Sequence, residues 1–234
     1  MILHLPDTRC TGDLFVQAGM AAQGHDTREP TPFEHVLVED RQGGIRYWPD
    51  VVSPSVAQTW FDVLRDGANW TAMRRPMYDR VVDVPRLLAS YKAHEFPVSL
   101  PLQAILERVQ ALAPAPYTSA GLNLYRDGSD SVAKHGDKLH SLAEGHPITL
   151  LSLGAPRRML IREVSGRRDT IAIDLMPGSV LRMSHAAQTT HEHGIPKTRR
   201  SIGARMSVVF RVRPGTTVLG GARRNAALVS TGPG

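Results

Sequence analysis

The chain has 234 residues, of which 41% are hydrophobic and 21% charged, a balance typical of a globular domain with a substantial buried core. Its 28 Lys and Arg outnumber its 22 Asp and Glu, and the net charge of +6 permits a polyanionic partner such as nucleic acid. The single Cys10 excludes an internal disulfide, and no apolar stretch approaches the roughly 18 residues of a membrane span. We therefore expect a cytoplasmic protein without a membrane segment.

The N-terminal part of the chain predicts a leader, two strands and a helix. Residues 1–30 show no hydrophobic period, so we expect an irregular leader. Residues 35–38 and 45–48 favour short strands, with Gly43-Gly44 as a hairpin turn. Ser53 and Pro54 predict the start of a helix that Gly67 ends. We expect its buried stripe to consist of Val56, Trp60, Val63 and Leu64.

The next segment predicts two strands and a second helix. Residues 81–84 and 87–91 favour strands that Pro85 and Arg86 interrupt. The stretch also carries many cations: Arg74, Arg75, Arg80, Arg86 and Lys92. Aromatic residues lie among them, so the stretch could follow a phosphate backbone and stack on bases, or it could be a solvated strand pair. Pro101 predicts the start of the second helix, whose apolar face is Leu102, Ile105, Leu106, Val109 and Leu112.

The second half of the chain predicts strands, expected near residues 120–125, 148–153, 159–163, 170–175, 180–183 and 205–213. So many short strands indicate a sandwich or barrel of the jelly-roll kind. We predict a mainly β fold with flanking helices, a double-stranded β-helix core and an N-terminal helix and strand cover. Residues 31–213 form one domain, with the cover and nucleotide-recognition region at 31–117 and the core at 118–213, and residues 214–234 form a flexible tail.

His135 and Asp137 are separated by one residue, so an extended backbone would place both side chains on one face. A neutral imidazole and a carboxylate on one face are two thirds of the 2-His-1-carboxylate triad of non-haem iron(II) sites. Taken alone, such a pair is more often two solvated loop residues than two metal ligands. A metal site therefore requires a third ligand from elsewhere in the chain.

The last predicted strand has two faces of opposite character. Arg205, Ser207, Val209 and Arg211 share one face, and the alternate positions are apolar. If the apolar face packs outward, two guanidinium groups point into the sandwich, where an unpaired charge is costly. A small dicarboxylate co-substrate would supply partners for them. The alternative is that both arginines are solvated at the strand ends.

The order of these motifs resembles the AlkB-type Fe(II)/2-oxoglutarate dioxygenases. The resemblance extends from Met77, through Val84-Pro85-Arg86 and Ser152-Leu153-Gly154, to Pro214. It rests on one set of residues: Asn123, Tyr125, His135, Asp137, His193, Arg205 and Arg211. The resemblance implies that iron(II) is bound by His135, Asp137 and His193. It also implies that 2-oxoglutarate is held by Arg205 and Tyr125 at its distal carboxylate and lies near Asn123 and Arg211 at its keto-acid end.

A competing histidine and departures from the family pattern leave parts of the site open. His191 competes with His193 for the third ligand position, and we prefer His193 because the sequence His-Gly-Ile-Pro-Lys matches the family's distal motif. Ser207 stands where the family has Asn, and its hydroxyl can still donate a hydrogen bond to the co-substrate. Lys138 and Leu139 follow the aspartate, where base-repair members carry an acidic residue, which leaves the substrate open.

The resemblance implies oxidative demethylation of N-alkylated bases in DNA or RNA, with DNA favoured. The reaction would consume O2 and 2-oxoglutarate and release formaldehyde, succinate and CO2, and we expect a monomer. Substrate contacts would come from the cavity wall, the segment after the aspartate and the cationic segment: Arg86, Tyr91, Lys138, Leu139, Arg74, Arg75 and Arg80. Two alternatives stay open: a dioxygenase of the same fold acting on a small molecule or protein, and a cupin-like metal-binding module.

Overall fold

The computed structural model describes residues 32–77, 79–165 and 170–215, so the expected leader and nearly all of the expected tail lie outside the described residues. The helices are α1 (Pro54–Gly67), α2 (Leu102–Leu112) and α3 (Ala187–Thr190), with 3-10 turns η1 (Ala93–Glu95) and η2 (Leu139–Ser141). None of the described helices has the length and apolar character of a membrane span. The strands are β1 (His35–Val38), β2 (Ile45–Trp48), β3 (Thr71–Met77), β4 (Arg80–Lys92), β5 (Ser119–Tyr125), β6 (Val132–His135), β7 (Ile148–Gly154), β8 (Arg157–Glu163), β9 (Thr170–Leu175), β10 (Val180–Met183), β11 (His191–Ile195) and β12 (Arg205–Arg211).

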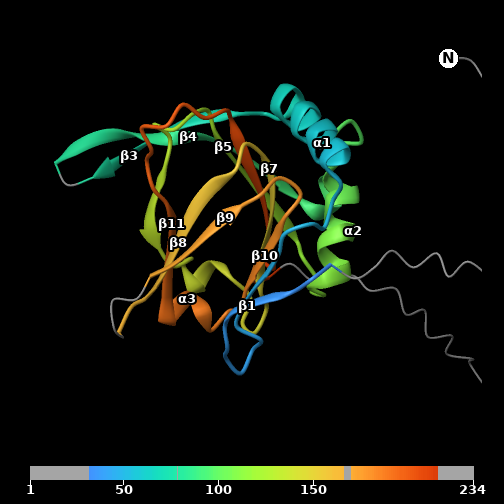
Figure 1. Ribbon diagram of the computed structural model, residues 1–234, viewed down its shortest axis with the longest axis vertical. Coiled ribbons are helices and arrows are strands. Elements are labelled where there is room, and N and C mark those ends of the chain that lie inside the picture. The colour runs from blue at the N-terminus through green and yellow to red at the C-terminus, as the bar shows by residue number, and fades with distance from the viewer. Residues whose placement is uncertain (1–31, 78, 166–169, 216–234) are drawn as a thin grey trace, which may run out of the picture. The chain divides into compact units, whose positions relative to one another are not determined.

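The strands form two antiparallel sheets. The larger sheet has the order β1-β2-β10-β7-β12-β5-β4-β3, and the smaller has the order β6-β11-β8-β9. Figure 1 shows α1 and α2 on one side of the larger sheet and β8, β9 and β11 on the other. The predicted fold class, a jelly-roll core with flanking helices, is confirmed. Strands from both sides of the expected division at residue 117 join the same sheet, since β4 pairs with β5 and β2 pairs with β10.

Two apolar clusters hold this arrangement together. One packs α1 and α2 against the outer face of the larger sheet and includes Leu64, Ile105 and Phe210. The other lies between the two sheets and includes Ile161 and Val209. Phe210 and Val209 are neighbours on β12, so the predicted alternation of that strand is confirmed: its apolar face meets the helices, and its polar face points between the sheets.

Helix α1 begins and ends as predicted, but its buried stripe was only partly predicted: Leu64 is buried as expected, and Trp60 is partly buried. The Ser53 hydroxyl accepts a hydrogen bond from a backbone N–H of the first turn, and Pro54 opens the helix. The buried residues are Ala57, Phe61 and Leu64, while Val56 and Val63 are about two-fifths exposed. Small Ala57 lets the helix lie close to the sheet, so the stripe is centred one position later than the large apolar side chains suggest.

Five elements differ from the sequence expectation. Pro85 does not interrupt the strand, because β4 runs continuously from Arg80 to Lys92. Residues around Pro85 sit at a register shift against β3 and before the pairing with β5 begins, so the missing N–H breaks no ladder bond. Strands β3, β6 and β11 and the short α3 were not predicted. Their polar or mixed sequences carry no period-two apolar signal.

Candidate active site

Two histidines and an aspartate come together where β6 meets β11 in the smaller sheet. The antiparallel pairing places His135, the last residue of β6, directly opposite His193. Asp137 follows two residues later, and one ligand atom from each of the three side chains lies within 4.8 Å of the others. Two imidazoles and one carboxylate leave further coordination positions open, as in mononuclear iron(II) sites. The described residues therefore fit a catalytic metal ion.

The surroundings of these side chains favour the protonation states that a metal ligand needs. The backbone oxygen of Ala133 accepts a 2.8 Å hydrogen bond from Nδ1 of His135, so Nε2 carries the free lone pair. Burial, reinforced by His135, lowers the pKa of His193 to about 4, and its imidazole is neutral at pH 7. Burial of Asp137 opposes ionisation, but the charge and the 2.6 Å hydrogen bond of Arg211 outweigh it, so the pKa of Asp137 is lowered.

A close contact with α3 explains the glycine between His135 and Asp137. A Cβ at Gly136 would lie 2.3 Å from the backbone oxygen of Gln188, where no side chain fits. The side-chain oxygen of Gln188 also accepts a 3.0 Å hydrogen bond from the backbone N–H of Asp137. Helix α3 therefore holds the turn that carries two of the three candidate ligands.

Arg205 is fully buried at the start of β12. Its Nε and Nη2 donate to Oγ of Ser152 at 3.3 and 3.2 Å, and its guanidinium lies 5.2 Å from the ring centre of Tyr125. Nη1 has no hydrogen-bond partner, the only buried side-chain nitrogen or oxygen in this state within the described ranges. Burial lowers the pKa of Arg205 to about 10. A buried N–H without an acceptor indicates that an anionic group from outside the chain completes the site.

The unpartnered guanidinium and the candidate metal ligands line one inner cavity of about 190 Å³. The pairing of β12 with β5 sets Arg205 opposite Tyr125 and Ser207 opposite Asn123, two rungs along the same ladder. Arg211 lies further along β12 and also lines this cavity. The residues predicted from the motif order are thus brought together: Asn123, Tyr125, His135, Asp137, His193, Arg205, Ser207 and Arg211. Such a cavity fits a metal-chelating dicarboxylate such as 2-oxoglutarate.

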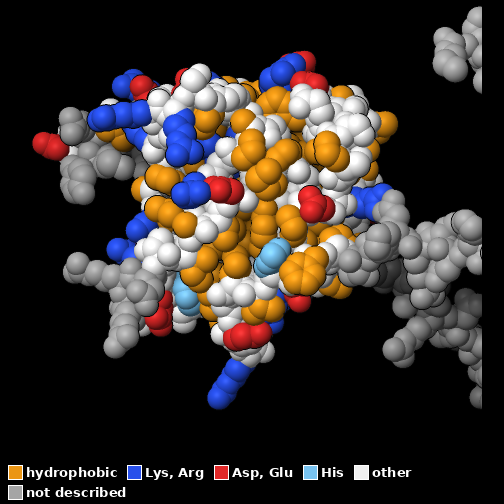
Figure 2. Space-filling view, viewed as in Figure 1, with side chains coloured by type: hydrophobic (Ala, Val, Ile, Leu, Met, Phe, Trp, Pro, Cys, Tyr) orange, Lys and Arg blue, Asp and Glu red, His pale blue; other side chains and the backbone are white. Residues whose placement is uncertain are grey.

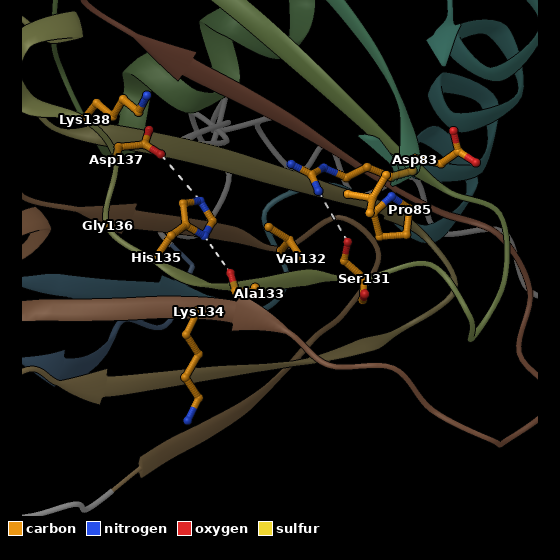
Figure 3. A pocket seen from close by; sticks show the side chains of 12 residues that line it. Asp83, Pro85, Ser131, Val132, Ala133, Lys134, His135, Gly136, Asp137 and Lys138 are labelled. Carbon is orange, nitrogen blue, oxygen red and sulfur yellow. Dashed lines mark hydrogen bonds and ion pairs between the residues drawn. The ribbon is translucent and has the colours of Figure 1, made fainter. Parts of the chain in front are cut away.

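A larger cavity of about 420 Å³ adjoins the inner one, and both are lined by Arg86, Val132, His135 and Asp137. Figure 3 shows Lys138 beside Asp137 at one end of this outer cavity and Asp83 with Pro85 at the other. The outer cavity therefore lies against the metal ligands, where a substrate would have to bind.

Arg86 is anchored at the boundary between the two cavities. Its Nε donates to Oδ1 of Asn123 at 2.9 Å, and Nη1 donates to the backbone oxygen of Ser131 at 3.3 Å. These bonds link β4 to β5 and to the segment before β6. Arg86 was predicted to form part of the cavity wall, and the structure places it there.

Two other predicted substrate residues lie elsewhere. Tyr91 was expected on the cavity wall, but it shares a face of β4 with Leu87 and Ala89 and packs into the cluster under the helices. Its hydroxyl accepts a hydrogen bond from the backbone N–H of Asn69. The correction follows from the pleat, because Arg86 and Tyr91 are five positions apart and must point to opposite faces. Leu139 is about a third exposed and lines neither cavity, whereas the preceding lysine, Lys138, lines the outer one.

The predicted phosphate contacts lie on the β3–β4 hairpin. Arg74 forms an exposed 3.1 Å ion pair with Asp83 of the outer cavity. Arg75 and Arg80 belong to β3 and β4, but their side chains lie outside the described part of the chain. His191, the competing histidine, bonds with its neighbour Thr190 and is not part of the three-residue cluster.

Sequence reasoning assigned no role to three residues that support the site: Ser152, Gln188 and Arg157. Arg157 is buried, and its guanidinium donates to backbone oxygens of Asp127, Asp130 and Pro196, which precede β6 and follow β11. It therefore ties together the two strands that carry the histidine ligands. The strand predicted at 159–163 did not include Arg157, and nothing in the sequence names its carbonyl partners.

Known proteins that are similar to this chain include two enzymes and one solved structure. DNA oxidative demethylase ALKBH2 of Bos taurus is 29% identical over 117 residues, which cover 47% of this chain and 42% of that protein. Alpha-ketoglutarate-dependent dioxygenase alkB homolog 3 of Bos taurus is 28% identical over 185 residues, 70% of this chain and 64% of that protein. The chain thus spans about two fifths of the length of the former and under two thirds of the latter. The solved structure of OsALKBH1 aligns with a TM-score of 0.49 and 16% identity, covering 72% of this chain and 97% of that chain.

A family comparison covers most of the described residues. Residues 44–213 match the 2OG-Fe(II) oxygenase superfamily, and this range contains every candidate ligand and all the described strands except β1. The chain belongs to the 2OG-Fe(II) oxygenase superfamily and is of its AlkB type.

Proposed function

We propose that the chain is an iron(II)- and 2-oxoglutarate-dependent dioxygenase that removes alkyl groups from ring nitrogens of nucleobases, with DNA preferred over RNA. One observation carries the proposal: the unpartnered N–H of buried Arg205 lines the same cavity as the cluster of His135, Asp137 and His193. A plain metal-binding module has no use for a buried guanidinium facing its metal. The relatives named as DNA oxidative demethylases support nucleic acid as the substrate.

The residues of the inner cavity would have separate roles. His135, Asp137 and His193 would hold iron(II), and Arg205 with Ser207 would bind a carboxylate of 2-oxoglutarate. Arg211 holds the Asp137 carboxylate in place through its 2.6 Å hydrogen bond. When bound, iron(II) supplies the redox chemistry by which O2 oxidises both 2-oxoglutarate, to succinate and CO2, and an N-methyl group, to N-hydroxymethyl. The N-hydroxymethyl group then releases formaldehyde and leaves the N–H of the repaired base.

The surroundings of the outer cavity suit a nucleic-acid substrate. His193 is buried, so a base stacked in a duplex cannot reach the metal and would have to be flipped out or come from a single strand. The cavity of about 420 Å³ adjoining the metal ligands is in the size range of small-ligand sites. Figure 2 shows Lys and Arg side chains gathered at the end of this face where Figure 1 places β3 and β4, which suits a phosphate backbone.

Mass spectrometry of alkylated oligonucleotides tests the proposal. DNA and RNA oligonucleotides with single N-methyl or etheno bases are incubated with the protein, iron(II), ascorbate and 2-oxoglutarate. We expect loss of the alkyl mass together with formation of succinate. His135→Ala should abolish both, whereas the matched variant His191→Ala, which changes a histidine two residues from His193 on β11, should retain them. Succinate formation that no alkylated oligonucleotide stimulates would refute the nucleic-acid substrate and favour a small-molecule or protein substrate.

A further inference from the structure

The outer cavity is lined by charged side chains of both signs. Its charged side chains are three cations and two acids: Arg86, Lys134, Lys138, Asp83 and Asp137. The inner cavity next to it adds Arg205 and Arg211 and no further acid. A substrate in the outer cavity therefore meets an excess of positive charge on the protein.

Neither carboxylate of the outer cavity is well placed to accept a hydrogen bond from a base bound beside Lys138. Figure 3 shows Asp83 at the end of the cavity opposite Asp137 and Lys138. Asp83 is paired with Arg74 at 3.1 Å, on an exposed part of the β3–β4 hairpin. Asp137 is paired with Arg211 at 2.6 Å and is also a candidate metal ligand. Within the described lining, no other acidic side chain is present. A base bound beside Lys138 that carries a positive charge or an amine donor thus lacks a nearby carboxylate that is not already paired.

Lys138 is the cation of the outer cavity that is available to a substrate. Arg86 already donates to Asn123 and to a backbone oxygen. Figure 3 shows the Lys134 side chain running away from the cavity, whereas Lys138 extends beside Asp137. Among the described residues, the Lys138 ammonium has no hydrogen-bond or ion-pair partner, so it can donate to an oxygen of a bound base.

N-methylated bases fall into two chemical classes that this charge distinguishes. Methylation at N3 of cytosine gives a cation with an exocyclic amine, which needs an acceptor and is repelled by an ammonium. Methylation at N3 of thymine gives a neutral ring with the methyl group between two carbonyl oxygens, which are acceptors for an ammonium. The two bases have nearly the same shape, so the charge and the edge pattern decide between them.

We propose that this site prefers neutral N-alkylated bases edged by carbonyl oxygens over cationic bases with an exocyclic amine, and that Lys138 sets the preference. This inference rests on the proposed function, since it names the class of base that the same cavity takes. Leu139, the next residue, lines neither cavity and supplies no acceptor that would reverse the preference.

A matched pair of substrates tests the inference. Two oligonucleotides of one sequence carry either 3-methylthymine or 3-methylcytosine, and kcat/KM is measured for each with the protein and its co-substrates. We expect the parent protein to favour 3-methylthymine by about tenfold or more. Lys138→Glu should shift the ratio toward 3-methylcytosine by at least a similar factor, and Lys138→Met should give an intermediate ratio. Lys134→Met is the control for lost charge alone and should leave the ratio unchanged.

The two kcat/KM values are compared within each variant, so a loss of activity that affects both substrates equally leaves their ratio unchanged. A parent protein that demethylates 3-methylcytosine faster, or a ratio that Lys138→Glu leaves unchanged, overturns the inference and leaves the proposed function standing. If neither oligonucleotide, nor any other alkylated one, is demethylated, the proposed function fails and the inference fails with it.

Discussion

Arg205 provides the sharpest test of the site, because its replacement should change stability and co-substrate binding in opposite directions. The guanidinium is fully buried, and one of its nitrogens has no partner. Burial lowers its pKa to about 10. This fall corresponds to on the order of 3 kcal/mol of unfavourable free energy for keeping the charge buried. Arg205→Met removes the charge and keeps much of the volume, so the free protein should become more stable.

Binding of 2-oxoglutarate should become weaker in Arg205→Met. Removing one partner of a buried, hydrogen-bonded charge pair costs roughly 2–5 kcal/mol, which corresponds to a rise of about 30-fold to several thousand-fold in the Kd of 2-oxoglutarate. The hydroxyls of Ser152 and Ser207 remain in the variant, but neither carries a charge. The parent protein should therefore be stabilised by 2-oxoglutarate, whereas the Arg205→Met variant should show almost no stabilisation at the same concentration.

Thermal unfolding with and without 2-oxoglutarate, under anaerobic conditions with iron(II), measures both effects. Arg157 is the matched control, because it is another buried arginine whose guanidinium donates to three backbone oxygens. Arg157→Met leaves those carbonyls without donors, so it should lower the Tm, while Arg205→Met should raise it without 2-oxoglutarate. A lower Tm for Arg205→Met, or an undiminished response to 2-oxoglutarate, would refute the role of Arg205.

Three further predictions concern the ligand turn, the core and the pH dependence of stability. Gly136→Ala introduces a Cβ that would lie 2.3 Å from a backbone oxygen of α3, so iron(II) affinity measured by titration should fall about tenfold or more. Leu64→Ala should cost about 2–5 kcal/mol in urea unfolding, whereas Val63→Ala on the exposed side of α1 should cost under about 0.5 kcal/mol. Burial opposes ionisation of Asp130, but hydrogen bonds from Arg126 outweigh it and lower the pKa of Asp130. Because the pKa of Asp130 in the folded protein lies below its unfolded value of about 3.9, the ionised carboxylate stabilises the fold above about pH 4, and this stabilisation is lost as the pH falls further. The free energy of unfolding should therefore fall less below about pH 4 in Asp130→Asn than in the parent protein.

The sequence predicted most elements that bury an apolar face. β9 and β10 have the predicted bounds, and α2 buries the predicted Leu102, Ile105, Leu106 and Val109. These predictions were possible because the spacing of apolar residues indicates which face of an element is buried. β6 and β11 carry few apolar residues and are held by pairing with each other and with β8. The candidate histidine ligands on these strands were predicted from the order of the motifs, whereas the strands themselves have no apolar period that would predict them.

Residues that act through a distant partner could not be predicted in the same way. Ser152 meets Arg205 because β7 pairs with β12, and the sequence gives no register between strands 53 residues apart. Tyr91 was misplaced for a related reason. It was grouped with the cations by its position in the chain, whereas the pleat of β4 turns it toward the helices. In both cases the sequence does not give the pairing register of the strands, which depends on the whole sheet.

The register of β12 also explains why packing and chemistry cannot be separated in this chain. Met206, Val208 and Phe210 are buried against the helices, and the intervening residues line the inner cavity. If the pairing of β12 shifted by one residue, three apolar side chains would point into the inner cavity. The guanidinium of Arg205 would then point into the apolar core under the helices. The apolar face of β12 therefore fixes which side chains face the cavity, and α1 and α2 contribute to co-substrate binding although neither touches the inner cavity.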